Sequence, residues 1–201
     1  MTEAAATERG ARERILAAAV ERIASDGIDD MRIARVAMDA GVSTSLVHYH
    51  FETREALLAE ALEYSYEVAA DVRLGDEDDA ETDPQRRLLM MIDQCLPYPG
   101  VLRQDWVLWV ELWLRTVRHP ELGPTAARLY ERMRDWLSEG IEACGARAGR
   151  DPGELADRTL ALCDGLGVRV LIGEMPIEYA REQVWRYLAD ELDLDRNLIA
   201  S

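Results

Sequence analysis

The amino-acid sequence predicts an all-α protein of about nine helices. Alanine, leucine, arginine and glutamate are abundant and β-branched residues are sparse, a mixture that favours helix over sheet. Apolar residues recur at the i, i+3, i+4 spacing of a helical stripe along most of the chain, and we find no convincing strand pattern. With 201 residues, 48% of them hydrophobic, the chain can bury a substantial core.

Glycine, proline and capping residues set the expected helix boundaries. The expected helices span residues 9–25, 32–39, 43–50, 53–73, 83–96, 102–119, 125–147, 151–172 and 177–192. The signals that separate them are, in order, Asp26-Gly27, Gly41, Thr53, Pro97, Pro120, Gly123-Pro124, Asp151-Pro152 and Met175-Pro176. We expect residues 1–8 to be a disordered tail and the acidic stretch 75–84 to be a solvated loop rather than a metal site.

The chain is organised around the segment Arg32–Phe51. Its first half is a short helix, in which Val36 and Ala37 share one apolar face. Gly41 suits the left-handed conformation that ends helices, and Ser43 can cap the helix that follows. Two short helices joined by a glycine turn form a helix-turn-helix, a motif in which the second helix enters the DNA major groove.

Three consecutive stretches resemble the signature of the tetracycline-repressor (TetR) family of bacterial regulators. They are Ala40-Gly41-Val42-Ser43-Thr44, His48-Tyr49-His50-Phe51 and Thr53-Arg54-Glu55-Ala56-Leu57-Leu58. Their order, spacing and position match over roughly residues 10–60. His48 stands where the family usually has Tyr, and Arg54 replaces the usual Lys. We therefore expect this protein to recognise an operator sequence of its own.

The resemblance implies a helix-turn-helix DNA-binding domain over residues 1–52 and an effector-binding and dimerisation domain over residues 53–201. It implies a transcriptional repressor that a small-molecule effector releases from a roughly palindromic operator, because effector binding moves the fourth helix. It also implies a homodimer formed by the last two helices. The eighth helix fits that role because it is apolar nearly all round between Leu160 and Ile172. The alternative is a monomer that buries both helices internally.

The candidate DNA-binding residues lie in and around the helix-turn-helix. Side chains expected in the groove are Thr44, Ser45, His48 and Tyr49, beside the capping Ser43. Side chains expected at phosphate are Arg32, Arg35, His50, Thr53 and Arg54.

A second informative stretch lies in the sixth expected helix. Trp106, Trp109 and Trp113 fall at i, i+3 and i+7, so they share a face with Val110. Such a stripe is commonly core, but the resemblance implies an effector cavity, and three indoles suit a flat apolar molecule or an organic cation. Choline-sensing repressors of the family have a similar recognition segment, which favours the cation.

The same effector site is expected to include residues of three other helices. They are Asp93 and Asp164 as buried acids, with Met91 and Met133. A carboxylate in an apolar helix needs a partner, and a bound cation would serve. Glu111, in contrast, points away from the tryptophans and is expected to form a surface ion pair with Arg115.

Charge and motif content limit the other functions. The net charge of −16 is unusual for a DNA-binding protein, but residues 1–60 carry only −4 of it, from 7 arginines and 11 acidic side chains. Because residues 1–60 are acidic, an alternative function remains open, in which the protein is a helical protein-interaction adaptor that has lost its affinity for DNA. We find no phosphate loop, metal-ligand spacing or catalytic triad, and therefore expect neither an enzyme nor a cofactor. The widely spaced cysteines indicate no disulfide framework, and the lack of a signal peptide or membrane span predicts a cytoplasmic protein.

Overall fold

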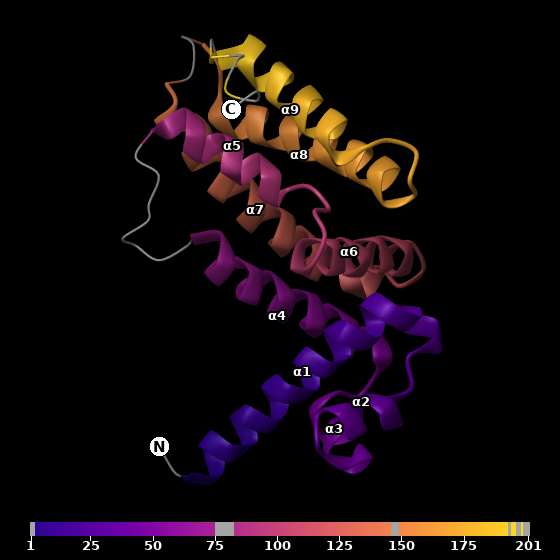
Figure 1. Ribbon diagram of the computed structural model, residues 1–201. Helices are drawn as coiled ribbons and strands as arrows, with labels where there is room; N and C mark the ends of the chain where they lie inside the picture. Colours follow the sequence, from indigo (N-terminus) through magenta and orange to yellow (C-terminus); the bar gives the residue numbers. More distant parts are fainter. Residues whose placement is uncertain (1–2, 75–82, 146–148, 193, 196–197, 199–201) are drawn as a thin grey trace. The chain divides into compact units, whose positions relative to one another are not determined.

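The computed structural model describes residues 3–74, 83–145, 149–192, 194–195 and 198. Nine α-helices and one short 3-10 helix occupy these residues, which confirms the predicted all-α class (Figure 1). The α-helices are α1 Glu3–Asp30, α2 Ile33–Asp39, α3 Thr44–His50, α4 Arg54–Leu74, α5 Pro84–Gln94, α6 Val101–Arg118, α7 Gly123–Ala143, α8 Pro152–Leu171 and α9 Ile177–Leu192. The 3-10 helix, Pro120–Leu122, was not predicted.

The chain divides into two compact units, and each is described by itself. The N-terminal unit contains Met1–Ala70 and Gln104–Ala127, so it includes α1 to α3, most of α4 and most of α6. The C-terminal unit contains Asp71–Arg103 and Arg128–Ser201, so it includes α5, most of α7, and α8 and α9.

In the N-terminal unit, α1, α2 and α3 pack on one another (Figure 1). Their apolar stripes are fully buried at Ile15, Ile23 and Val47. The predicted caps are present, because Ser43 Oγ accepts from Leu46 N at 3.2 Å and Thr53 Oγ1 accepts from Ala56 N at 3.0 Å. The third and fourth helices therefore begin where the sequence predicts.

The first helix differs from its prediction at both ends. It begins at Glu3, so the disordered tail predicted for residues 1–8 is wrong from residue 3 onward; the alanine-rich start of the chain favours helix. At the other end the predicted break is present as a kink, because the φ of 73° and ψ of 161° at Gly27 are not helical, and a further helical stretch continues to Asp30. This conformation is essentially restricted to glycine.

Two other boundaries are corrected. The fifth helix is shorter than predicted, because Asp83 is its N-cap and Cys95 its C-cap. The seventh ends at Ala143 rather than at residue 147, since Gly145 adopts a φ of 77° and its N–H bonds to the Glu142 carbonyl at 3.0 Å. Most of the predicted acidic loop, residues 75–82, lies outside the described residues.

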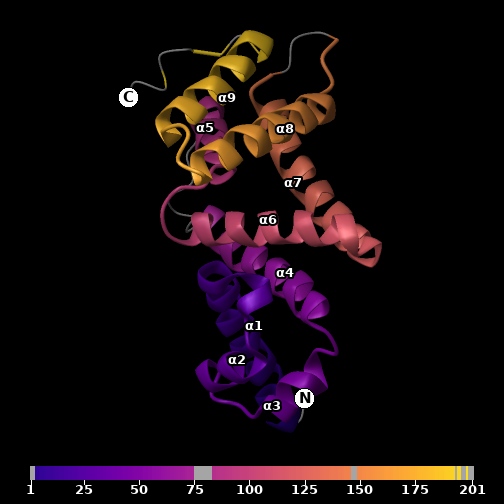
Figure 2. The same cartoon turned by 90° about the vertical axis from the view of Figure 1, so that its right-hand side faces the viewer.

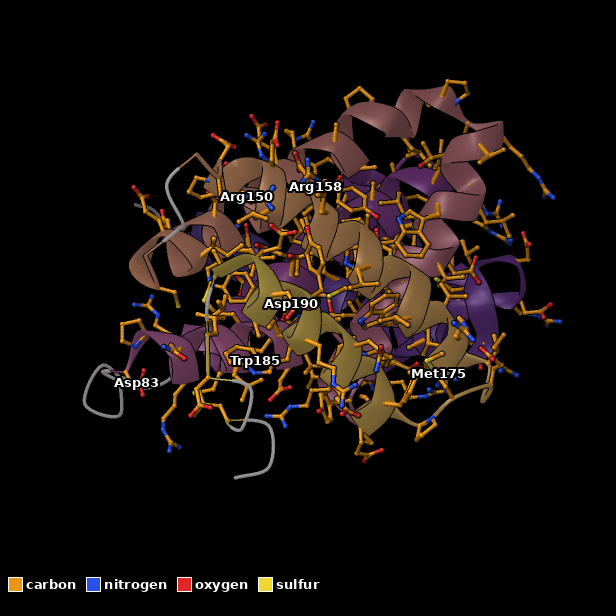
Figure 3. The ribbon with its side chains drawn as sticks, turned by 90° about the horizontal axis from the view of Figure 1, so that it is seen from above. Asp83, Arg150, Arg158, Met175, Trp185 and Asp190 are labelled. Carbon is orange, nitrogen blue, oxygen red and sulfur yellow. The ribbon has the colours of Figure 1, made fainter. Side chains whose placement is uncertain are left out.

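The C-terminal unit has one apolar core, to which α5, α7, α8 and α9 all contribute. In Figure 1 and Figure 2, α8 runs beside α9, and the two helices pack on each other. The largest fully buried side chain is Trp185 of α9, which is labelled in Figure 3 with Met175 of the preceding turn. Its indole N–H donates to the Asp195 carbonyl at 3.2 Å, so the buried donor is satisfied.

The eighth helix is covered on one side only. Leu160, Cys163 and Leu166 are buried in the core, as the apolar pattern predicts. By contrast, Ile172 at the C-cap is 72% exposed, and a Cβ on Gly165 would meet no atom within 4 Å. One face of α8 is therefore open in the single chain, with Ala161, Gly165 and Ile172 exposed beside the charged Arg158 and Arg169. Among the described residues, no helix is both long and apolar enough to cross a membrane.

Replacement of Gly27 by Ala tests the kink in α1. We expect the Gly27→Ala variant to lose about 1–3 kcal/mol of unfolding free energy, because a Cβ is strained at this φ and ψ. In a chain of this size each kcal/mol lowers the melting temperature by roughly 2–4 °C, which calorimetry would detect.

Gly10→Ala is the matched control in the same helix. The nearest atom to its added Cβ would be 3.9 Å away, so it should leave stability equal or higher. Equal stabilities for Gly27→Ala and Gly10→Ala would contradict the positive φ at Gly27.

Candidate DNA-binding and effector-binding sites

The turn between α2 and α3 has the geometry that the sequence predicts. Gly41 adopts a φ of 66°, which a residue with a Cβ rarely occupies, and the Val42 N–H bonds back to the Ala37 carbonyl at 2.9 Å. Val47 and Phe51 anchor α3 in the core at 0% and 3% exposure. The recognition helix is thus fixed along one face, and its opposite face is left to solvent.

The candidate DNA-binding residues gather on that solvent face and around it. Those that are exposed are Arg32, Arg35, Ser43, Thr44, Ser45, His48, Tyr49, Thr53 and Arg54. Tyr49 is 72% exposed, which is unusual for a tyrosine that only packs. His50 is half-buried between the rings of Tyr49 and Phe51, and its buried Nε2 has no hydrogen-bond partner. All ten candidates lie between Arg32 and Arg54, in the helix-turn-helix and at the start of α4.

The first helix holds the motif from behind. The Arg14 guanidinium donates to the Ala40 carbonyl at 3.1 Å, and Arg22 pairs with Asp39 at 2.5 Å. The Arg12 guanidinium lies 5.6 Å from the centre of the Phe51 ring. These contacts tie the turn and the end of the helix-turn-helix to α1, so α1 to α3 form one head.

The sixth helix contacts this head through two charged side chains. Glu111 Oε1 accepts from the backbone N–H of the fully buried Ile28, at 3.3 Å. Arg115, whose side chain is only 14% exposed, pairs with Asp29 and, at 3.4 Å, with Glu55. The predicted Glu111–Arg115 surface pair is replaced by these contacts to α1 and α4.

Asp29 also joins the head to the start of α4. Its backbone carbonyl accepts from the Arg54 guanidinium at 3.2 Å, while its carboxylate pairs with Arg115. Arg54 is predicted to lie near phosphate, and in the structure its guanidinium also joins the start of α4 to the end of α1. The end of α1, the start of α4 and α6 meet at this point.

The three tryptophans of α6 form one aromatic cluster. The Trp106 and Trp113 rings lie 6.0 Å apart at 87°, and the Trp109 and Trp113 rings lie 6.1 Å apart at 44°. Trp106 and Trp109 are 7% and 8% exposed, and Trp113 is half-buried. Val110, which was grouped with them, is instead 37% exposed. The structure brings together the predicted indoles but leaves the valine at the surface.

The other predicted effector residues lie in the C-terminal unit. Met91 is buried, with its thioether against the backbone of Gly140, and Met133 is partly buried against the same core. Neither predicted acid is fully buried, and each has a protein partner. Asp93 pairs with Arg181 at 2.6 Å, and Asp164 accepts from the Tyr130 hydroxyl at 2.7 Å.

Burial shifts the titration of these two acids. It raises the pKa of Asp93, although the Arg181 guanidinium opposes the shift, and it raises the pKa of the nearby Tyr98 to about 12. Burial likewise raises the pKa of Asp164, with the Tyr130 hydrogen bond opposing it. Burial thus disfavours the ionised form of each carboxylate, which is the behaviour expected of acids in an apolar helix.

Sequence reasoning missed the acid that is most deeply buried. Asp105 of α6 is 4% exposed and accepts a hydrogen bond from Ser65 of α4, which is also 4% exposed. Its position directly before the apolar run that begins at Trp106 was the available signal. Glu111 was noticed but assigned to the surface, since nothing local indicates that it meets Ile28.

These features define a helix-turn-helix DNA-binding protein with a helical C-terminal region. The sequence profile of the tetR family of bacterial regulatory proteins matches residues 15–61, and that of the C-terminal region of BetI-type transcriptional repressors matches residues 84–193. The chain belongs to the tetR family of transcriptional regulators. It is therefore a regulator rather than an enzyme; members of the family bind operator DNA and small-molecule effectors and usually act as dimers.

Individual relatives are similar over nearly the whole chain. The HTH-type transcriptional regulator BetI of Ectopseudomonas mendocina is 30% identical, with 92% of this chain and 93% of the relative covered. The nucleoid occlusion factor SlmA of Pectobacterium carotovorum is 26% identical, with 96% and 100% covered.

Two solved structures are similar throughout. A transcriptional regulator from Saccharomonospora viridis in complex with choline has a TM-score of 0.74 and 30% identity, with 92% of this chain and 96% of that chain covered. A TetR-family regulator from Rhodococcus sp. has a TM-score of 0.79 and 28% identity, with 92% and 99% covered.

Because the pKa of Asp164 is raised, we expect the Asp164→Asn variant to gain stability, by an amount that depends on pH. Because the folded pKa is above the ordinary value of 3.8, the carboxyl contributes most to stability below that value, and the contribution is lost as the pH rises through the folded pKa. Asparagine resembles the protonated form and can still accept from Tyr130. We therefore expect a higher melting temperature at pH 7 and a difference that shrinks toward pH 4.

The exposed Asp135 of α7 provides the control for loss of one negative charge. Asp135→Asn should change the melting temperature little at either pH. A gain from Asp164→Asn that is as large at pH 4 as at pH 7 would contradict the raised pKa.

Proposed function

We propose that this regulator is a homodimeric repressor that a cationic, aromatic-stacking effector releases from a palindromic operator. The observation that carries the proposal is that α6 has the tryptophan cluster on one side and contacts the DNA-binding head on the other. An effector that displaces α6 would pull on Ile28, Asp29 and Glu55. The similarity to a regulator solved with choline supports an organic cation.

The recognition helix would read the operator from its exposed face. We assign Thr44, Ser45, His48 and Tyr49 to base edges, because hydroxyl and imidazole groups can bond there and a tyrosine ring can pack on a thymine methyl. The phosphate contacts fall to Arg32, Arg35, His50, Thr53 and Arg54, together with Ser43. Selection from a random DNA library should enrich a palindrome with half-sites about 34–36 Å apart.

The open face of α8 supports dimerisation through α8 and α9. Ile172 is 72% exposed, and Tyr179 of α9 is 48% exposed. The small residues Ala161 and Gly165 are exposed on α8, so a second helix could approach its backbone closely. A second copy of the chain related by a two-fold axis would cover this face and place the two heads on successive major grooves.

The effector site is proposed to centre on Trp106, Trp109 and Trp113 of α6. Met91, Met133, Asp93 and Asp164 belong to the C-terminal unit, and their part in effector binding stays a prediction, as does that of the exposed Val110. Asp93 is the weaker of the two acids as a ligand group, because Arg181 already neutralises it. Displacement of α6 would reach α4 through Glu55 and would change the separation of the two heads.

A protein-interaction role is the second candidate. The acidic head and the similarity to a nucleoid occlusion factor favour it. Failure of the library selection to enrich any sequence, at low and at physiological salt, would overturn the repressor and favour this role.

Tyr49→Ala tests the recognition helix. Because Tyr49 is 72% exposed, its loss should leave the melting temperature unchanged but weaken operator binding by about 1–3 kcal/mol. A gel-shift titration with the selected operator measures the change.

Val117→Ala is the control, since Val117 is 84% exposed on α6. Operator affinity should not change in this variant. Equal affinities for wild type and Tyr49→Ala would remove Tyr49 from the DNA interface.

Arg115→Ala tests the contact between α6 and the head. The variant should still bind choline, used as the probe, and should still bind operator. Effector and operator sites in regulators are typically coupled by about 5–150-fold in affinity. Most of that factor should be lost, because the guanidinium joins α6 to both Asp29 and Glu55.

Arg118→Ala removes the same charge from an exposed position in the last turn of α6 and should keep the coupling. An undiminished coupling in Arg115→Ala would show that another contact carries the signal.

A further inference from the structure

One residue of the head, Asp29, contacts two other helices. Its carboxylate pairs with the Arg115 guanidinium of α6, and its backbone carbonyl accepts from Nη1 of Arg54 at 3.2 Å. Asp29 lies in the short helical stretch that follows the Gly27 kink in α1, and Arg54 is the first residue of α4. All of these residues belong to the N-terminal unit. A movement of α6 that displaces Asp29 would therefore displace the partner of Arg54.

The α6 end of this connection is held more firmly than the α4 end. The Arg115 side chain is only 14% exposed and also pairs with Glu55 at 3.4 Å, so it lies between two carboxylates. The Asp29 side chain is 81% exposed, and Arg54 is exposed as well. A hydrogen bond between exposed groups contributes little to stability, because water competes for both partners. The Arg54 guanidinium can therefore change its orientation at small cost, whereas Arg115 follows α6.

Arg54 is suited to bind an anion outside the protein. A cation in the first turn of a helix gains nothing from the helix dipole, because the positive end of the dipole lies there. A guanidinium has five N–H donors in a planar fork, and the Asp29 carbonyl takes one of them. The other donors can bind a phosphate oxygen while the carbonyl keeps the group oriented.

We propose that Arg54 carries the effector signal to the DNA within a single head. While α6 holds Asp29, the Asp29 carbonyl orients the guanidinium so that its other donors bind an operator phosphate. When an effector displaces α6, Asp29 moves with Arg115 and the guanidinium loses that orientation. This inference rests on the proposed function, because it assumes that the effector displaces α6 and that Arg54 contacts phosphate.

A DNA duplex with one half-site separates this role from a change in the distance between the heads. Such a duplex binds a single head, so the separation of two heads does not affect its affinity. Loss of the oriented Arg54 contact weakens binding to one half-site as well as to the full palindrome. Binding of the half-site, taken from the selected operator, therefore reports on Arg54 and not on the separation.

Titration of the half-site with and without saturating choline, at several salt concentrations, is the test. In wild type, choline should weaken binding by about fivefold or more, the lower end of the usual coupling between two sites. The slope of log affinity against log salt concentration should also become shallower by about 0.9, because one phosphate contact is lost.

Arg54→Lys should abolish both effects of choline on the half-site. Lysine keeps the charge, so the steep salt dependence should remain. Its single ammonium nitrogen lacks the planar fork with which arginine can bond to the Asp29 carbonyl and to phosphate together. Affinity without choline should fall, since the charge is no longer oriented, and choline should change neither the affinity nor the slope.

Two control variants locate the effect. Arg35→Lys makes the same exchange at another exposed arginine assigned to phosphate, in α2. The described contacts of Asp29 are with Arg54 and Arg115 and not with Arg35, so the choline effect should remain in this variant. Arg54→Ala should have the shallower salt slope even without choline. A wild-type slope in Arg54→Ala would remove Arg54 from the phosphate contacts and overturn the proposal.

Asp29→Asn tests the same connection from the α6 side. It removes the charge that pairs with Arg115 and keeps the backbone carbonyl that holds Arg54. The effect of choline on the half-site should fall toward that in Arg54→Lys. This variant keeps the test decisive if Arg54→Lys disturbs the head, which a thermal melt would show.

The outcomes distinguish this inference from the proposed function. A full choline effect on the half-site in Arg54→Lys and in Asp29→Asn would overturn the role of Arg54 alone. If choline weakens wild-type binding to the palindrome but not to the half-site, the separation of the heads carries the whole effect, and only this inference fails. If choline weakens neither, or no operator can be selected, the proposed function fails with it.

Discussion

The polar contacts of α6 are the interaction on which the N-terminal unit depends. Glu111 satisfies the backbone N–H of the buried Ile28, and Arg115 pairs with both Asp29 and Glu55. A buried N–H without an acceptor would cost about 1–3 kcal/mol, so the end of α1 is stable in this position only while α6 supplies the carboxylate. At the Gly27 kink the backbone lies close to the Glu111 carboxylate. A Cβ added at Gly27 would be 3.1 Å from Glu111 Oε1, the oxygen that accepts from the Ile28 N–H. A head that depends on contacts from another helix can respond to what that helix binds.

In the proposed function, α6 has two roles. The tryptophans of α6 lie along one part of its surface, while Glu111 and Arg115 lie on another and contact the head. A ligand at the aromatic cluster would therefore act on the same helix that contacts α1 and the start of α4. Coupling of this kind needs two arrangements of α6 that differ in free energy by only a few kcal/mol. Contacts made by exposed partners such as Asp29, 81% exposed, are weak enough to allow both arrangements.

The features that could be predicted from the sequence are those set by residues close together along the chain. The helix-turn-helix, its Gly41 turn and its Ser43 cap are local signals, and the structure confirms each of them. The side-chain partners could not be predicted, because they lie far away in the sequence. Glu111 and Ile28 are 83 residues apart, and Asp93 and Arg181 are 88 apart. Asp93 and Asp164 were expected to be buried and in need of a ligand, but tertiary packing supplied Arg181 and Tyr130. Burial of Asp105 depends in the same way on packing that brings Ser65 of α4 to α6, which no periodicity reveals.

One pair of titrations tests the proposed linkage between effector and operator binding. Operator affinity would be measured with and without saturating choline, and choline affinity with and without saturating operator. We expect choline to weaken operator binding and operator to weaken choline binding by the same factor, since coupling between two sites is reciprocal. Operator affinity that stays unchanged at saturating choline, in a protein shown to bind both, would contradict it.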